Sequence, residues 1–418
     1  MEVSQMADSL VGSEIIKIAA EVSELKKQGE AISNLTIGDF DPSQFPIPED
    51  LRDQINLAYK KGFTNYPPND GVALLREALH EFTLERHQLD YPAADYIISG
   101  GSRPLIYSCF LTLIDKGDKV VFPIPSWNNN HYCHFTGAEM VMVPTTVENN
   151  FMPTASELEG TLSGAVLLAL CSPLNPTGTM FSAEELAKIC DLVLAENAKR
   201  KEGEKPLYLM YDQIYSLLTF GNHKHVNPVT LRPAMRPYTI FIDGASKGFA
   251  STGVRVGWGF GPAKIIAKMR SIISHMGAWA PTPEQNAVAA FLRETEQVDQ
   301  FLGDFRFKVQ RSLDTLYKGI KSLKEQGYPV DAIAPMGAIY LTVKIDIQGR
   351  TTGDGEVIQN SMEVNSYLIK KAKLALVPFS AFGNEPSSAW FRASIGGCSL
   401  QDIEQLLPRL KAALDKLV

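Results

Sequence analysis

Short apolar runs alternate with longer segments of helical periodicity over most of the first 270 residues. The pattern predicts strands at residues 96–99, 119–127 (broken by two prolines), 165–171, 207–211 and 239–242. It predicts helices at residues 49–60, 74–85, from about Leu105, at 264–270 and at 284–323. Polar residues mostly follow the carboxyl ends of the strands. The order is typical of a doubly wound α/β domain with a mainly parallel sheet and a ligand in the crevice beyond the strand ends.

Both ends of the chain predict further elements. Ser13 can cap a helix whose apolar residues keep helical spacing, and a short strand is predicted at residues 31–37. Strands predicted at 337–344, 373–377 and 390–396 indicate a second sheet. We therefore expect a large domain at residues 45–300, and a smaller α/β domain formed by residues 1–44 and 301–418.

Composition and charge exclude several classes of protein. The 418 residues are 45% hydrophobic and 21% charged, as in ordinary globular proteins. Five scattered cysteines without C-x-x-C spacing argue against a disulfide framework or a metal site. The net charge of −7 argues against nucleic acid as a partner. Neither a signal peptide nor an apolar run of ~20 residues is evident, so we expect a cytoplasmic protein without a membrane segment.

The segment at residues 239–259 carries the clearest chemistry. Asp243 and Gly244 end an apolar strand, Ser246 and Lys247 follow in a loop of small residues, and Arg255 comes eight positions after the lysine. A lysine just beyond a core strand can be partly desolvated, which lowers its pKa and makes the amine nucleophilic. Such an amine can form a Schiff base with an aldehyde cofactor, and Ser246 and Arg255 could bind a phosphate. The alternative is a solvated turn.

This segment resembles the Ser-Lys…Gly-x-Arg-x-Gly signature of class I pyridoxal-phosphate enzymes, the aspartate aminotransferase superfamily of fold type I. The resemblance implies that Lys247 holds pyridoxal 5′-phosphate and acts as the general acid and base. It also implies partner residues elsewhere in the chain.

Three loops match places where this family binds its cofactor. Gly101 and Ser102 lie between a predicted strand and a helix, where free N–H groups and the helix dipole attract an anion. The resemblance makes this loop the phosphate cup and places Arg103 among the cofactor-binding residues. Arg103 departs from the small or amide residue expected there, so its own role stays open. Trp127, after two prolines, would stack on the pyridine ring. Asn175, in Asn-Pro-Thr-Gly, would bind the phenolic oxygen and the substrate.

Polar residues in apolar surroundings complete the predicted site. Asp212 ends a predicted strand, where a buried carboxylate needs a partner, although an exposed helix-capping role is the alternative. The resemblance pairs Asp212 with the pyridinium nitrogen and Tyr215 with the phenolic oxygen. Arg392, inside an apolar strand, also needs a carboxylate partner, which in the family is the substrate's α-carboxylate. Gly38 would offer its N–H to the substrate.

Tyr66 extends the resemblance to a second subunit. Tyr66, Gly71 and Arg76 are spaced as in the family's Tyr-x-x-x-x-Gly-x-x-x-Leu-Arg pattern. The tyrosine of that pattern reaches the cofactor phosphate of the neighbouring subunit, which implies a homodimer. A simple packing role for Tyr66 is the alternative.

The resemblance as a whole implies an aminotransferase that moves an amino group from an α-amino acid to a 2-oxo acid. A lyase or cyclising synthase would share Lys247, Asp212 and Arg392, and a non-enzymatic regulator could also bind the cofactor. The amino donor stays open, because residues 274–279 lack the arginine found in some dicarboxylate-specific relatives.

Overall fold

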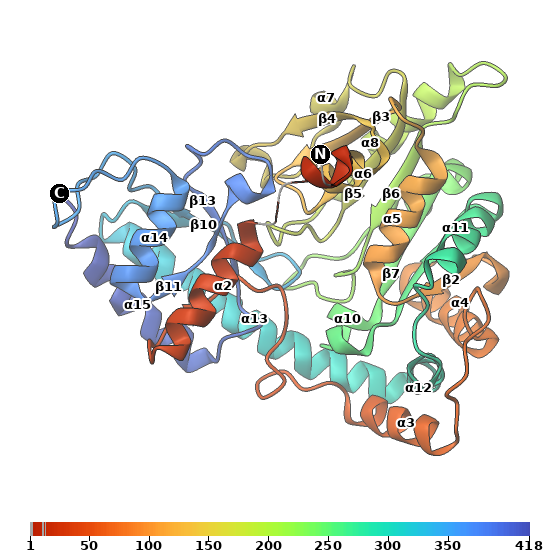
Figure 1. The fold of residues 1–418 in the computed structure, drawn as a ribbon, viewed down its shortest axis with the longest axis horizontal. Coiled ribbons are helices and arrows are strands. Elements are labelled where there is room, and N and C mark those ends of the chain that lie inside the picture. Colours follow the sequence, from red (N-terminus) through yellow and green to blue (C-terminus); the bar gives the residue numbers. More distant parts are fainter. Residues whose placement is uncertain (1–2, 11, 13) are drawn as a thin grey trace.

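A seven-stranded sheet forms the larger half of the computed structural model, which describes residues 3–10, 12 and 14–418 (Figure 1). Its strand order is β2-β8-β7-β6-β5-β3-β4. The strands are β2 (Tyr96–Ser99), β3 (Lys119–Ile124), β4 (Glu139–Pro144), β5 (Ala165–Cys171), β6 (Tyr208–Asp212), β7 (Thr239–Gly244) and β8 (Gly257–Phe260). β8 is antiparallel to both of its neighbours, whereas the β3–β4, β3–β5, β5–β6 and β6–β7 pairs are parallel. The predicted mainly parallel sheet is therefore confirmed.

Helices cover both faces of this sheet and supply its core. One face packs against α5 (Ser102–Leu113), α6 (Asn129–Thr136) and α11 (Ala263–Met276). The opposite face packs against α3 (Glu49–Lys60), α4 (Ala73–His87), α8 (Ala183–Ala198) and α12 (Thr282–Arg293). The central strands β5, β6 and β7 are buried almost throughout, as expected for parallel strands covered on both sides.

A four-stranded antiparallel sheet lies in the other half of the molecule, in the order β12-β13-β10-β9. Its strands are β9 (Val330–Ala332), β10 (Tyr340–Ile345), β12 (Val377–Pro378) and β13 (Trp390–Ser394). It shares a hydrophobic core with α13 (Thr295–Glu325), α14 (Ser361–Ala372) and α15 (Leu400–Leu414). Arg392 lies at the centre of β13, as the sequence predicts.

The N-terminal segment packs against this second half. β1 (Ser33–Asn34) pairs in parallel with β11 (Leu374–Ala375), and α2 (Glu14–Lys27) buries Ile18 and Val22 beside them. The predicted helix cap, Ser13, lies outside the described residues. The shorter α-helices of the described residues are α1 (Gln5–Asp8), α7 (Ala155–Leu158), α9 (Pro228–Leu231) and α10 (Ala245–Gly248).

Several predicted elements differ from the structure only in their ends, and three differ in their organisation. The helix predicted at residues 284–323 is two helices, α12 and α13, separated at Glu294, whose ψ of 69° is not helical. Both helices bury an apolar face, so the apolar periodicity continues across the break. The faces have different partners, because α12 packs on α3 and α4, whereas α13 packs on α15 and β9. The strand predicted at 31–37 is paired only at Ser33–Asn34, and residues 373–377 divide between two sheets.

We propose the domain division at residues 45–300, with 1–44 and 301–418 forming the smaller domain. The division is supported by the hydrophobic clusters, because the apolar side chains of α14, α15 and the small sheet form a core separate from those on either face of the large sheet. α13 runs from the large half into the small one, as Figure 1 shows in cyan. Among the described residues, no helix is both long enough and apolar enough to cross a membrane.

Candidate active site

A cavity of about 670 Å³ lies beyond the carboxyl ends of the central strands, between the two sheets. Most of the predicted site residues line it: Gly38, Ser102, Arg103, Trp127, Asn175, Asp212, Tyr215, Ser246, Lys247, Arg255 and Arg392. Gly101 lies directly beside the cavity, in contact distance of Arg255. Tyr66 is not among the lining residues. β5, β6 and β7 end at the same edge of the sheet, which brings Asn175, Asp212 and Lys247 together. Gly38 from the N-terminal segment and Arg392 from β13, more than 350 positions apart, line the same cavity.

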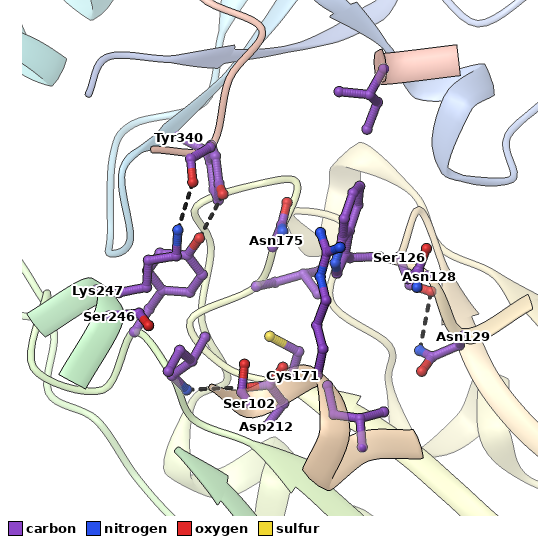
Figure 2. A pocket seen from close by; sticks show the side chains of 18 of the residues that line it. Ser102, Ser126, Asn128, Asn129, Cys171, Asn175, Asp212, Ser246, Lys247 and Tyr340 are labelled. Carbon is purple, nitrogen blue, oxygen red and sulfur yellow. Dashed lines mark hydrogen bonds between the residues drawn. The ribbon is translucent and has the colours of Figure 1, made fainter. Parts of the chain in front are cut away.

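Lys247 enters the cavity from α10, the single helical turn that follows β7 (Figure 2). Its Nζ donates a hydrogen bond of 2.6 Å to the carbonyl oxygen of Gly38. Burial lowers the pKa of the Lys247 amine to about 8, and the positive charges of Arg392, Arg103 and Arg255 act in the same direction. The charge of Asp39 partly opposes these effects. A larger fraction of this amine is therefore neutral at pH 7 than of an ordinary lysine.

Asp212 lies at the carboxyl end of β6, close to Ser102 and Cys171 in Figure 2. Its Oδ1 accepts a hydrogen bond of 3.0 Å from the backbone N–H of Ile214. Burial raises the pKa of this carboxyl to about 6, and the hydrogen bond from Ile214 only partly offsets the effect. No lysine or arginine in the described part of the chain forms an ion pair with Asp212. A cation bound in the cavity would therefore favour its ionised form.

The loop before α5 has the geometry of an anion site. Gly101 is the N-cap residue of α5, with φ of +99° and no side chain to bond the first N–H groups of the helix. A Cβ at Gly101 would collide with the guanidinium of Arg255. Arg255 holds this position by donating hydrogen bonds to the carbonyl oxygens of Gly100 (2.8 Å) and Thr252 (2.6 Å). Free N–H groups, the helix dipole and a guanidinium thus meet beside Ser102 and Ser246.

Arg392 is 2% exposed and has no carboxylate partner among the described residues. Its guanidinium donates to Oδ1 of Asn175 at 3.0 Å and to the carbonyl oxygen of Thr36 at 2.5 Å, whereas its Nε has no partner. The charged group also lies over the rings of Tyr340 and Phe382. Burial lowers its pKa from the ordinary value. An arginine held in this way, without a counterion, is suited to bind an incoming carboxylate.

Two aromatic residues predicted from the sequence line the cavity in different settings. The hydroxyl of Tyr215 lies 2.5 Å from that of Tyr340, and burial raises the pKa of Tyr215 well above its usual value. The ring of Trp127 lies under the guanidinium of Arg103, whose central carbon is 5.3 Å from the ring centroid. Arg103 itself is exposed at the cavity wall and makes no hydrogen bond within the described residues.

Sequence reasoning missed Tyr340 and Asp39. Tyr340 bonds Tyr215, and its hydroxyl also closely approaches Gly38, where a Cβ would be 2.5 Å away. Asp39 accepts a hydrogen bond of 2.6 Å from Thr252 and influences Lys247 through its charge. Asp39 directly follows the predicted Gly38, which was an available signal. Tyr340 lies in an ordinary apolar strand pattern, so nothing in the sequence indicates its role.

Tyr66 lies outside the cavity of its own chain. The side chain is 88% exposed, and its ring meets the edge of Trp279 with centroids 5.6 Å apart. The neighbouring Ala278 supports the anion loop, because its carbonyl oxygen accepts a hydrogen bond of 2.8 Å from the N–H of Gly100. Among the described residues, no group of three or more His, Cys, Asp or Glu side chains could hold a metal ion.

Comparison with known proteins identifies the family. The sequence model of "Aminotransferase class I and II" matches residues 30–410. A probable aspartate/prephenate aminotransferase of Rickettsia prowazekii is 30% identical over 419 aligned positions, covering 99% of each chain. An aspartate aminotransferase of Rhizobium meliloti is 27% identical and covers 97% of this chain and 94% of its own.

Solved structures agree with this family. The crystal structure of the aspartate aminotransferase from Rhizobium meliloti superposes with a TM-score of 0.91 at 26% identity, covering 100% of both chains. The aspartate aminotransferase of Thermus thermophilus with maleate gives a TM-score of 0.87 at 26% identity, covering 99% of this chain and 100% of that one. The expected fold type I architecture and the expected cofactor are thereby confirmed. The chain belongs to the class I and II aminotransferases, enzymes of fold type I that use pyridoxal 5′-phosphate to transfer amino groups.

Proposed function

We propose that this cavity transfers the amino group of an α-amino acid to a 2-oxo acid, with Lys247 as the residue that holds the cofactor. The observation that carries the proposal is the convergence of three groups: the low-pKa amine of Lys247, the buried carboxyl of Asp212 and the counterion-free Arg392. Each supplies a contact that amino transfer needs, and together they line a single cavity.

The residues present fit pyridoxal 5′-phosphate. The anion loop with Gly101, Ser102, Ser246 and Arg255 suits its phosphate, because N–H groups and a guanidinium are directed to one point. Asp212, which forms no ion pair with another described residue, suits the pyridine nitrogen. Asn175 and Tyr215 suit the phenolic oxygen, and Trp127 suits the flat face of the ring. We propose these roles for the residues named.

The bound cofactor supplies an electron sink for the bond that breaks at the substrate Cα. A negative charge on the buried Asp212 would keep the pyridine nitrogen of the bound cofactor protonated. Lys247 Nζ would move a proton between the substrate Cα and the aldehyde carbon of the cofactor. Its pKa of about 8 suits both directions near neutral pH.

Arg392 and Gly38 orient the substrate. We propose that the guanidinium of Arg392 binds the α-carboxylate. The carboxylate could then accept a hydrogen bond from Nε of Arg392, which has no partner among the described residues. Gly38 contributes its backbone N–H. Its carbonyl oxygen already accepts the hydrogen bond from Lys247, so the same residue contacts both the proton carrier and the substrate.

We further propose that the amino donor carries a second carboxylate. The relatives reported above are aspartate or aspartate/prephenate aminotransferases, and one was solved with maleate. Arg103 supports the same inference, because it is a cavity-lining cation without an ion pair in the described residues. Arg103 stays a predicted contact to the cofactor as well, since it flanks Trp127.

Initial rates across a panel of donors and acceptors test this function. We expect oxo-acid-dependent amino transfer that is faster from aspartate or glutamate than from alanine or phenylalanine. Release of pyruvate and ammonia without an oxo acid would instead identify a lyase. Absence of turnover by the cofactor-loaded protein would instead favour a non-enzymatic regulator. Either result would contradict the proposal.

We propose a homodimer with two shared active sites. Tyr66 is exposed and does not line the cavity of its own chain, which supports its predicted contact to the phosphate of a neighbouring subunit. Two-fold symmetry is the commonest arrangement for such a shared site, because one interface then completes both. We also propose a cytoplasmic location, supported by five cysteines that are all free thiols.

Mixing two inactive variants tests the shared site. Lys247→Ala and Tyr66→Ala chains should each be severely impaired as homodimers. A heterodimer would contain one site with both defects and one with neither, so activity should reappear at about half the wild-type value per dimer. The measurement is specific activity of heterodimers isolated with two different affinity tags. Inactive heterodimers, or an active monomer in sedimentation, would contradict the model.

A further inference from the structure

A buried polar cluster lies behind the floor of the cavity, on the opposite side of the large sheet from Asp212. Asp212 on β6 is in register with Ile242 on β7, so the next residues, Gln213 and Asp243, share the other face. Gln213 is 0% exposed and Asp243 is 4% exposed. The side-chain amide of Gln213 donates a hydrogen bond of 3.0 Å to Oδ2 of Asp243. Neither side chain lines the cavity.

This hydrogen bond joins the two strand ends that carry the reactive groups. Gln213 directly follows Asp212, and its backbone N–H bonds the carbonyl oxygen of Ile242 at 2.9 Å. Asp243 precedes the turn of Lys247, and its Oδ1 accepts a hydrogen bond of 2.7 Å from the N–H of Gly244, at the start of that turn. The Gln213–Asp243 contact therefore connects the backbone next to Asp212 with the backbone next to Lys247.

No lysine or arginine in the described part of the chain forms an ion pair with Asp243. Within the described residues its hydrogen-bond partners are Gln213 and Gly244, and the charge that acts on it is that of Asp212, which has the same sign. His225 reaches the cluster through Gln213, with 3.3 Å between Nε2 and Oε1, and His87 packs against His225. Burial lowers the pKa of both histidines, so neither supplies a positive charge at neutral pH. Burial also raises the pKa of Asp243 to about 8.

We propose that Asp243 is a positioning residue that works as a neutral, protonated acid, tying the strand end of Asp212 to the turn of Lys247 through Gln213. The inference rests on the proposed roles of Asp212 and Lys247. A neutral Asp243 leaves Asp212 as the single negative charge at the cavity floor, because two nearby carboxylates oppose each other's ionisation. The Gln213 amide can match a protonated partner by presenting its oxygen instead of its nitrogen.

The cofactor-free protein tests the neutral form. The pKa of Asp243 in the folded state lies above its ordinary value of 3.8, so its contribution to stability is lost as the pH rises toward about 8. Asp243→Asn lacks this titration. Wild type should therefore lose stability between about pH 5 and pH 8 while the variant does not, so the melting temperature of the variant minus that of wild type should increase over this range. Asp304→Asn, an exposed change of the same kind, should show no such trend.

The cofactor-loaded protein tests the connection between Asp243 and Gln213. Asp243→Ala should weaken cofactor binding about tenfold and shift the midpoint of the pH titration of the visible absorbance, because a buried partner is lost. Gln213→Met should act in the same direction while keeping the carboxyl group, and it serves if Asp243→Ala does not fold. Asp243→Asn, which keeps the shape and hydrogen bonds of the neutral acid, should restore both quantities to wild-type values.

Three results would overturn the inference. A pH-independent difference in melting temperature between Asp243→Asn and wild type would exclude the neutral acid. An Asp243→Asn enzyme that binds the cofactor as poorly as Asp243→Ala would do the same. If both Asp243→Ala and Gln213→Met bind the cofactor as wild type does and titrate at the same pH in visible absorbance, the proposed connection through Gln213 is excluded. The melting experiment uses no cofactor, so it stays informative even if the proposed roles of Lys247 and Asp212 fail.

Discussion

Replacing Lys247 by alanine is expected to slow amino transfer by at least ~10²–10⁴-fold, the usual contribution of general acid–base catalysis alone. The substitution removes the group that holds the cofactor and also the group that carries the proton. The amine lies on the turn that follows β7, with its pKa lowered to about 8 by burial and by three arginines. No other lysine lines the cavity among the described residues.

Two measurements check this prediction. Wild-type protein should be yellow, and borohydride reduction should leave the cofactor attached to the peptide that contains Lys247, as seen by mass spectrometry. Lys247→Ala should show neither property, whereas Lys268→Ala, an exposed change on α11, should behave as wild type. Normal multiple-turnover activity in Lys247→Ala would remove the assignment.

Replacing Asp212 is expected to slow the reaction by about 10²–10³-fold, the usual effect of losing one preorganised electrostatic contact. The charge, rather than the shape, should matter. Asp212→Asn and Asp212→Ala should therefore lose similar amounts of kcat and of cofactor affinity. Asp212→Glu, which retains a negative charge, should lose less. An Asp212→Asn enzyme with wild-type rate and cofactor affinity would contradict the proposed role.

Stability separates this effect from unfolding. The pKa of Asp212 in the folded, cofactor-free protein is about 6, above the ordinary value of 3.8. The stability that Asp212 contributes is thus present below about pH 4 and lost as the pH passes 6. At pH 7 the neutral Asp212→Asn protein should melt no lower than wild type. A large fall in melting temperature would mean that the lost activity reflects damage to the fold.

Local sequence patterns were sufficient for the large sheet because its strands are buried on both faces. β2 and β5 match the predicted ranges, and β6 and β7 differ by one or two residues. The apolar periodicity did not predict element boundaries where the apolar face of one segment packs on different partners along its length. The break between α12 and α13 illustrates this, since the same periodicity serves two different cores. Short pairings such as β1 with β11 depend on distant segments and leave little local signal.

The sequence by itself determined which residues we propose for the chemistry, through motifs whose spacing is set by strand ends, turns and helix starts. Lys247 after a buried strand and the glycine loop before α5 are of this kind. Their position at one edge also follows from the sequence, because parallel strands present their carboxyl ends together.

Only the tertiary structure decided the contacts between segments that are distant in sequence. It brings Tyr340 to Tyr215 and Gly38 to Lys247, and it leaves Arg392 buried without a counterion among the described residues. It also joins Gln213 to Asp243 behind the cavity. Burial and charge at each of these positions come from packing between separate elements, and pKa values follow from burial and charge. A local sequence pattern does not specify the burial or the charged neighbours of these side chains, so these features are determined only by the folded structure.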